Sequence, residues 1–154
     1  MDSRNQKILL SFFLLVILVG LFLAGILVGA SVFGWKAAQR AGNEVATIQN
    51  LKTIAAVEIQ YFNTHNRTFG TFDELVRENM LSLKFDGNAP ITEGYILRLS
   101  LTPGSMGAAL SYKLTADPLD DSYGRKHFYL DSASGQIHVD TERGAGPDDP
   151  LLDK

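Results

Sequence analysis

The chain reads KAAQRAGNEVATIQNLKTIAAVEIQYFNTH over residues 36–65. Apolar side chains recur in this segment at steps of three and four residues: Ala41, Val45, Ile48, Leu51, Ala55, Ile59 and Phe62. Because this spacing brings them onto one face of an α-helix, we expect an amphipathic helix that buries this stripe. Polar residues occupy the opposite face, and we interpret Glu58 as a charge at its flank. The rest of a domain is expected to pack on this helix.

The segment before this helix is uniformly apolar. Ile8–Trp35 counts 28 residues without an ionisable side chain, whereas a helix needs roughly 20 to cross a bilayer. The segment is therefore predicted to be a transmembrane anchor over residues 8–35. The alternative is a cleaved signal peptide, for which Val28-Gly29-Ala30 offers a cleavage site, although the apolar core of such peptides is only about 7–15 residues long.

Charge and glycine content add two expectations about the anchor. Residues 1–7 carry Arg4, Lys7 and the free α-amino group, which favours placing this N-terminal segment in the cytoplasm. Gly25-Ile26-Leu27-Val28-Gly29 follows a small-xxx-small pattern that lets a second helix approach closely. Glycine is also common in membrane helices without a partner, and that explanation of the pattern stays open.

Beyond the long helix, Thr71 and Glu74 predict a capping box at the start of a second, short helix. Its buried side is expected to consist of Phe72, Leu75, Val76 and Met80. Alternating apolar and polar side chains then predict four strands, at Tyr95–Leu99, Ala109–Leu114, Lys126–Leu130 and Gln136–Val139. Turns at Pro103-Gly104 and Ser134-Gly135 would join the first pair and the last pair into hairpins.

These elements define an α+β fold class. A long N-terminal helix, membrane-spanning in its first half and amphipathic in its second, is predicted to pack on an antiparallel sheet of about four strands. We assign the soluble domain to residues 36–142. Residues 143–154 are rich in Pro, Gly and Asp, so we expect a disordered acidic tail there.

Composition excludes several classes of function. Residues 36–154 hold 12 Lys and Arg against 16 Asp and Glu, with both signs scattered along the segment. Nucleic acid is not expected as a partner, because phosphate binding needs clustered cations. The chain has no cysteine, which excludes disulfides, thiolate metal sites and a cysteine nucleophile.

Two sets of residues contain the side chains that bind metal ions. The first would form where two strands pair and consists of His127, His138, Asp131 and Asp140. The second, a loop with oxygen ligands for Ca²⁺, consists of Asp117, Asp120 and Asp121. Strand alternation and loop composition explain both sets as solvated surface, so we expect no metal, cofactor or catalytic residue and a protein that is not an enzyme. Asn66-Arg67-Thr68 matches the glycosylation sequon, which matters only in a eukaryotic secretory pathway.

Several strings of the domain follow a shared pattern. They are Arg40-Ala41-Gly42-Asn43-Glu44, Leu51-Lys52-Thr53-Ile54, Phe69-Gly70-Thr71-Phe72, Gly94-Tyr95, Tyr112-Lys113-Leu114-Thr115-Ala116-Asp117-Pro118 and, around the last hairpin, Gly124 and Phe128-Tyr129-Leu130-Asp131. Together they resemble the type IV pilin and type II secretion pseudopilin superfamily over about Arg40–Val139. The resemblance implies a pilin-like domain in which a membrane helix continues into an amphipathic helix packed on an antiparallel sheet.

The membrane helix departs from that family. Its members carry a Gly at which the prepilin peptidase cleaves, then a Phe, and four residues later a Glu that pairs with the freed amine of a neighbour. The register places these positions at Ser11, Phe12 and Val16. The Pro that often kinks the family helix falls at Phe33. The family's processing and polymerisation are therefore not expected of this chain.

The resemblance implies a non-catalytic accessory or minor component of a type IV pilus or type II secretion-like assembly. Such a protein would be a single-pass protein of the bacterial inner membrane with its C-terminal domain outside the cytoplasm. Its partners would be the membrane and pilus or secretion subunits, contacted through the membrane helix or the domain surface. The alternative is a stand-alone envelope module that uses a pilin-like domain to bind or sense a ligand.

Overall fold

The computed structural model describes residues 3–104 and 109–152, and the side chains of all of these except residues 3–11, 27–33 and 109. The chain divides into two compact units, residues 1–38 and residues 39–154. Helix α1, Ser3–Thr64, contributes its beginning to the first unit and its end to the second.

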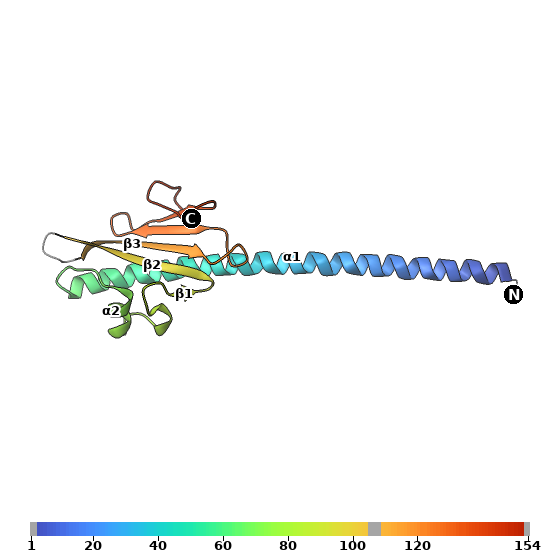
Figure 1. Cartoon of the computed structure of the whole chain (residues 1–154), viewed down its shortest axis with the longest axis horizontal. Helices are drawn as coiled ribbons and strands as arrows, with labels where there is room; N and C mark the ends of the chain where they lie inside the picture. The colour runs from blue at the N-terminus through green and yellow to red at the C-terminus, as the bar shows by residue number, and fades with distance from the viewer. Residues whose placement is uncertain (1–2, 105–108, 153–154) are drawn as a thin grey trace. The chain divides into compact units, whose positions relative to one another are not determined.

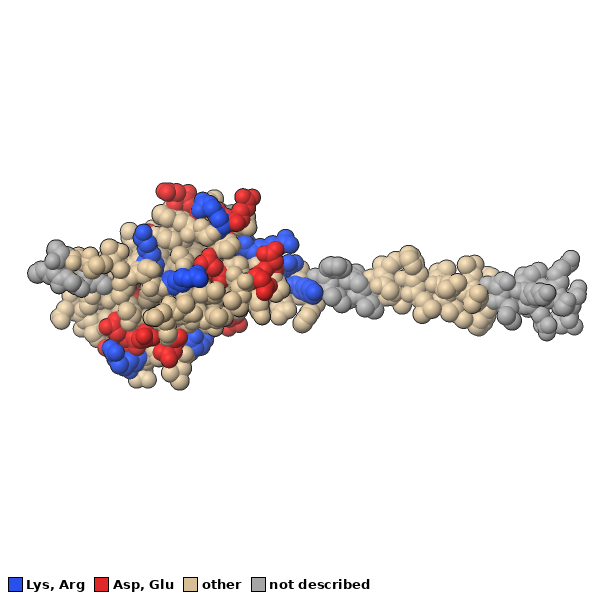
Figure 2. Space-filling model, in the orientation of Figure 1, with Lys and Arg blue, Asp and Glu red and all other residues tan. Residues whose placement is uncertain are grey.

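The described side chains of the first unit are apolar and exposed. Twelve large apolar residues between Phe12 and Ile26 have exposed fractions from 48% to 70%, and this segment carries no charged side chain in Figure 2. No helix in the part of the chain that the structure describes is both long enough and apolar enough to cross a membrane. The side chains at Ser11, at Phe33 and at Val28-Gly29-Ala30, including the Gly29 end of the small-xxx-small pattern, lie outside the described residues.

The second unit combines the end of α1 with two short helices and a sheet (Figure 1). The elements after α1 are α2 (Phe72–Arg77), the 3₁₀ helix η1 (Leu83–Phe85), β1 (Ile91–Thr92), β2 (Tyr95–Pro103), β3 (Ala109–Pro118), β4 (His127–Asp131) and β5 (Ile137–Asp140). The strands pair in chain order, each antiparallel to the next. The α+β class and the two predicted hairpins are thus confirmed.

The sheet has five strands rather than the expected four. The additional strand, β1, is only two residues long and pairs Ile91 with Ile96 and Thr92 with Tyr95. Two residues are too few to produce an alternating pattern, which is why the sequence did not reveal the strand. Glu93 and Gly94 connect β1 to β2 with positive φ angles of 54° and 76°, the pattern of a tight hairpin turn.

Strand register builds one apolar face on the sheet. Leu99, Leu114, Leu130 and Ile137 align across the four long strands, and a second row consists of Leu97, Ala116, Phe128 and Val139. These residues form a single core with Leu51 and Ile54 of α1 and with Phe72 and Leu75 of α2. The core therefore lies between α1 and one face of the sheet.

The expected capping box is confirmed. The Thr71 hydroxyl accepts a hydrogen bond from the Glu74 N–H, and the Glu74 carboxylate accepts one from the Thr71 N–H at 2.8 Å. Two backbone donors at the start of α2 are thereby satisfied. Of the predicted buried side, Phe72 and Leu75 are fully buried, whereas Val76 and Met80 are partly buried.

The buried face of α1 differs from the predicted stripe. The side chains with almost no exposure are Thr47, Leu51, Ile54, Glu58 and Tyr61, which also follow steps of four and three residues. Val45 and Ile59, which the pattern assigned to the interior, are both 59% exposed. The observed buried face contains two polar residues, Thr47 and Glu58. Because an apolar pattern does not include them, it predicted a face that is rotated about the helix axis by about one residue, or roughly 100°, from the observed one.

The C-terminal segment is ordered over residues 143–152, in contrast to the predicted disordered tail. The Asp149 carboxylate accepts hydrogen bonds from the Arg143 guanidinium at 2.6 Å and from the Gly146 N–H at 2.7 Å. The chain then runs along β5, where Leu152 donates its N–H to the Ile137 carbonyl at 2.8 Å. The polar composition of this segment predicted disorder. The segment is ordered because the Asp149 side chain closes the loop and Leu152 packs on the core.

The position of the buried face can be tested with two aspartate substitutions on α1. Leu51→Asp should lower the free energy of unfolding by about 4 kcal/mol or more, because an unpaired charge would enter the core. Val45→Asp should change it by no more than about 0.5 kcal/mol, because this side chain faces solvent. Urea unfolding followed by tyrosine fluorescence measures both values. Equal destabilisation by the two variants would contradict the observed face and favour the predicted stripe.

Candidate functional site

Of the His/Asp set that we interpreted as solvated surface, strand pairing places His127 opposite Asp140, but the two histidines are not paired with each other. Nδ1 of His127 lies 2.7 Å from Oδ1 of Asp117, which accepts its hydrogen bond, and Oδ2 of Asp117 is 2.9 Å from the Arg98 guanidinium. His138 pairs across the hairpin with Tyr129 rather than with His127, and its Nδ1 lies 2.6 Å from the Asp149 carbonyl oxygen. Each histidine therefore has its own protein partner.

The remaining carboxylates of both candidate sets stabilise turns. Burial raises the pKa of Asp131, but hydrogen bonds from Ser134, Tyr129 and Ala133 outweigh it and hold the pKa below its usual value. The N–H groups of Glu142 and Arg143 lower the pKa of Asp140. Hydrogen bonds from Ser122 lower that of Asp120.

Carboxylates held in this way have few lone pairs left for a cation. Among the described residues no group of three or more His, Asp and Glu side chains could hold a metal ion. In the loop from Asp117 to Asp121, which we interpreted as a solvated acidic turn, Asp117 is paired with Arg98 and His127, and the Asp120 carboxylate accepts from the Ser122 N–H at 2.7 Å. The sequon residues Asn66 and Arg67 lie exposed just after α1, with positive φ angles of 53° and 61°.

The start of the domain helix holds the loop between β3 and β4. Asn43 donates to the Tyr123 carbonyl at 3.0 Å, and the Glu44 carboxylate accepts from the Arg125 N–H at 3.1 Å. Gly124 lies between these two contacts, where a Cβ would clash with the Tyr95 hydroxyl. Three of the motif residues quoted from the sequence, Asn43, Glu44 and Gly124, thus meet in one structural contact.

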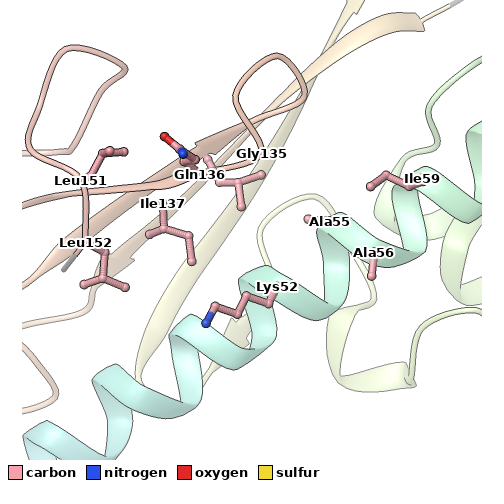
Figure 3. A pocket seen from close by; sticks show the side chains of 10 residues that line it. Lys52, Ala55, Ala56, Ile59, Gly135, Gln136, Ile137, Leu151 and Leu152 are labelled. Atoms are coloured by element: carbon pink, nitrogen blue, oxygen red, sulfur yellow. The ribbon is translucent and has the colours of Figure 1, made fainter. Parts of the chain in front are cut away.

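A cavity of about 460 Å³ lies between α1 and the β4–β5 hairpin (Figure 3). Its helix wall includes Lys52, Ala55 and Ile59, and its other walls come from the hairpin and from the C-terminal segment. Sequence reasoning missed this cavity, because its lining residues come from three segments far apart in the chain. No motif connects them.

Glu58 is the second feature that the sequence did not reveal. Interpreted from the pattern as a flank charge, it is instead fully buried, with an exposed fraction of 0%. Its Oε2 accepts a hydrogen bond from the Gly70 N–H at 3.0 Å, and its Oε1 has no hydrogen-bond partner in the described part of the chain. The interpretation was wrong because helix periodicity reports only the apolar members of a buried face.

The surroundings of Glu58 favour its neutral form. Burial raises its pKa most; the Gly70 hydrogen bond lowers it, and the negative charge of Glu74 raises it further, so that the pKa rises from 4.5 to about 7. A carboxyl group with a pKa in this range changes charge near neutral pH. The folded protein therefore binds a proton at Glu58 between pH 4.5 and 7 that the unfolded chain releases.

This proton makes stability depend on pH. The stabilisation of the fold by proton binding at Glu58 is fully present below about pH 4.5 and is lost as the pH rises through about 7, the folded-state pKa. We expect Glu58→Gln, which keeps a carbonyl acceptor for Gly70 but cannot ionise, to be more stable than wild type at pH 8 by up to about 3 kcal/mol. The difference should shrink towards pH 4.5.

Denaturant unfolding between pH 4.5 and 8 measures this difference. Glu142→Gln, at an exposed position, is the matched control and should follow the wild-type profile. Parallel wild-type and Glu58→Gln profiles would show that Glu58 is ionised throughout this range.

Comparisons with known proteins complete the description of the site. A scan of protein-family models, a search of curated proteins and a search of solved structures each find no match to this chain. Its function must therefore be argued from its own side chains and their arrangement.

Proposed function

We propose that this chain is a membrane-anchored, pilin-like accessory or minor component of a type IV pilus or type II secretion-like assembly, without catalysis of its own. The observation that carries the proposal is the apolar segment at the start of α1. Its large side chains from Phe12 to Ile26 are exposed. Exposed apolar area of this extent marks a surface that another apolar phase covers.

The sequence fits a lipid bilayer best as the apolar environment that covers this segment. Consecutive apolar residues surround a helix rather than forming one face, which is typical of a helix in lipid or in the interior of a large protein. The uncharged stretch Ile8–Trp35 has 28 residues and is bounded by Lys7 and Lys36, whereas roughly 20 residues suffice to span. The structure describes the side chains of this stretch at residues 12–26 and 34–35.

The orientation depends on the α-amino group, because Arg4 and Lys7 before the segment are matched in number by Lys36 and Arg40 after it. Arg4 and Lys7 with the α-amino group favour a cytoplasmic N-terminus. The single pass would then place the domain outside the cytoplasm of a bacterial cell, anchored in the inner membrane. Figure 2 supports a soluble domain: acidic and basic side chains are interspersed on its visible face, without an extended patch of one sign.

The arrangement of the domain supports the pilin-like part of the proposal. A helix that leaves the apolar segment and packs on an antiparallel sheet is what the resemblance implies. The motif residues Asn43, Glu44 and Gly124 lie in one long-range contact between that helix and the loop from β3 to β4. Residues shared with a family pattern are expected at contacts of this kind, because few other side chains would fit there.

Val16 supports an accessory rather than a polymerising role. It occupies the position at which the family places a Glu, and its side chain is 54% exposed and carries no charge. A chain without that carboxylate cannot form the family's charge pair with a neighbouring amine. Partners would instead contact the helix surface or the domain.

A stand-alone envelope module that binds a ligand is the second candidate. The cavity of about 460 Å³ in the domain favours it, because ligand sites commonly enclose about 300–1,000 Å³. Gene neighbourhood separates the candidates: pilus ATPase and prepilin-peptidase genes beside this gene favour the first, and an isolated gene favours the second.

Membrane anchoring can be tested by washing isolated membranes with high salt and then with alkali. The full-length protein should stay in the membrane fraction, because the apolar segment buries far more area than a peripheral contact. Leu18→Lys combined with Leu21→Lys should weaken this retention. Leu83→Lys, at a domain position that is 80% exposed, is the matched control and should not. Release of a product that begins at Ser31 would identify the segment as a signal peptide.

The accessory role predicts an intact N-terminus. Mass spectrometry of the purified protein should find the residues that precede Phe12, and sheared surface filaments should contain little or none of the chain. Filaments made mainly of this protein and beginning at Phe12 would refute the accessory role. They would show that close packing of a glycine-containing helix suffices for assembly without the charge pair.

A further inference from the structure

The cavity beside α1 has the shape of a short apolar trough. Lys52 and Ile59 lie at the two ends of its helix wall (Figure 3), which are two helical turns or about 10 Å apart. Ile137 of β5 and Leu152 of the C-terminal segment form the opposite wall. Ile59 is 59% exposed, so apolar surface is accessible at the mouth.

Lys52 is the one cationic side chain among the residues that line this cavity. It forms no ion pair with any described residue. Two acids of the adjoining segments are engaged elsewhere: Asp131 with Ser134, and Asp149 with Arg143. The trough therefore offers a positive charge without an ion-pair partner among the described residues, beside an apolar surface.

We infer that this cavity binds a fatty acid, with its carboxylate at Lys52 and the part of its aliphatic chain nearest the carboxylate along Ile59, Ile137 and Leu152. The charge of Lys52 selects an anion, and the apolar walls select the chain. One ammonium group and about 460 Å³ suit a single-chain carboxylate better than a two-chain phospholipid. The inference goes beyond the proposed pilin-like role and does not depend on it.

Photo-crosslinking tests this binding in the full chain. The protein is placed in phosphatidylcholine nanodiscs, or in buffer alone if it stays in solution without them, and is irradiated with a diazirine-bearing palmitic acid. Trypsin then releases residues 53–67, 127–143 and 144–154 as separate peptides, which together contain most of the cavity lining. Label on these peptides, lost on competition with unlabelled palmitate, is the expected result.

Paired variants test the two parts of the site. Lys52→Glu and Ile59→Glu should each reduce labelling of the cavity peptides about fivefold or more, because each places a negative charge where the carboxylate or the chain would lie. Their controls, Lys113→Glu and Val45→Glu, change an exposed lysine on β3 and an equally exposed apolar residue of α1 outside the cavity. Both controls should label as wild type does, and unchanged urea midpoints confirm that all four variants are folded.

Three outcomes would overturn the inference. Label confined to the peptides of residues 1–40 would show partition into lipid only. Equal competition by hexadecanol and palmitate, or wild-type labelling of Lys52→Glu, would show that no carboxylate is recognised. Capture of a second copy by Ile59→p-benzoylphenylalanine, unaffected by palmitate, would assign the trough to contact between chains.

Discussion

The unit of residues 39–154 depends on the burial of Leu51 and Ile54 against the apolar face of the sheet. Both side chains are fully buried, and they meet strand rows that run from β2 to β5. Burial of each such side chain contributes about 1.5–3 kcal/mol. α1 and α2, together with Phe85 of η1 and Leu152 of the C-terminal segment, exclude water from this face. The register of the strands and the rotation of α1 are therefore coupled.

Local chemistry explains which elements the sequence could predict. The capping box at Thr71 and the turn at Gly135 depend on neighbouring residues, so short-range patterns were sufficient. The rotation of α1 is a property of the assembled core, in which Thr47 and Glu58 are buried beside Leu51. An apolar pattern cannot identify a face that includes a hydroxyl and a carboxyl group, and it selected Val45 and Ile59 instead.

The candidate site shows the same division. His127, His138 and the aspartates were visible as ligand types, yet their partners depend on strand register and on the C-terminal segment, which the sequence suggested would be disordered. The trough at Lys52 and the burial of Glu58 involve segments separated by up to 100 residues in the chain. Only the folded chain brings these side chains together, and neither Lys52 nor Glu58 forms an ion pair with any residue that the structure describes.

The two edges of the sheet limit how this domain can meet other molecules. At one edge, β1 is two residues long; at the other, Val139 and Ile137 bond to Pro150 and Leu152 of the C-terminal segment. Exposed strand edges invite pairing with strands of other chains, and short or covered edges prevent it. Strand addition is thus disfavoured along β5, whereas on the other side β1 pairs only with Tyr95 and Ile96 of β2. Lateral association at the β5 side of this domain would have to use side-chain surfaces, which can be released and re-formed without breaking a shared backbone ladder.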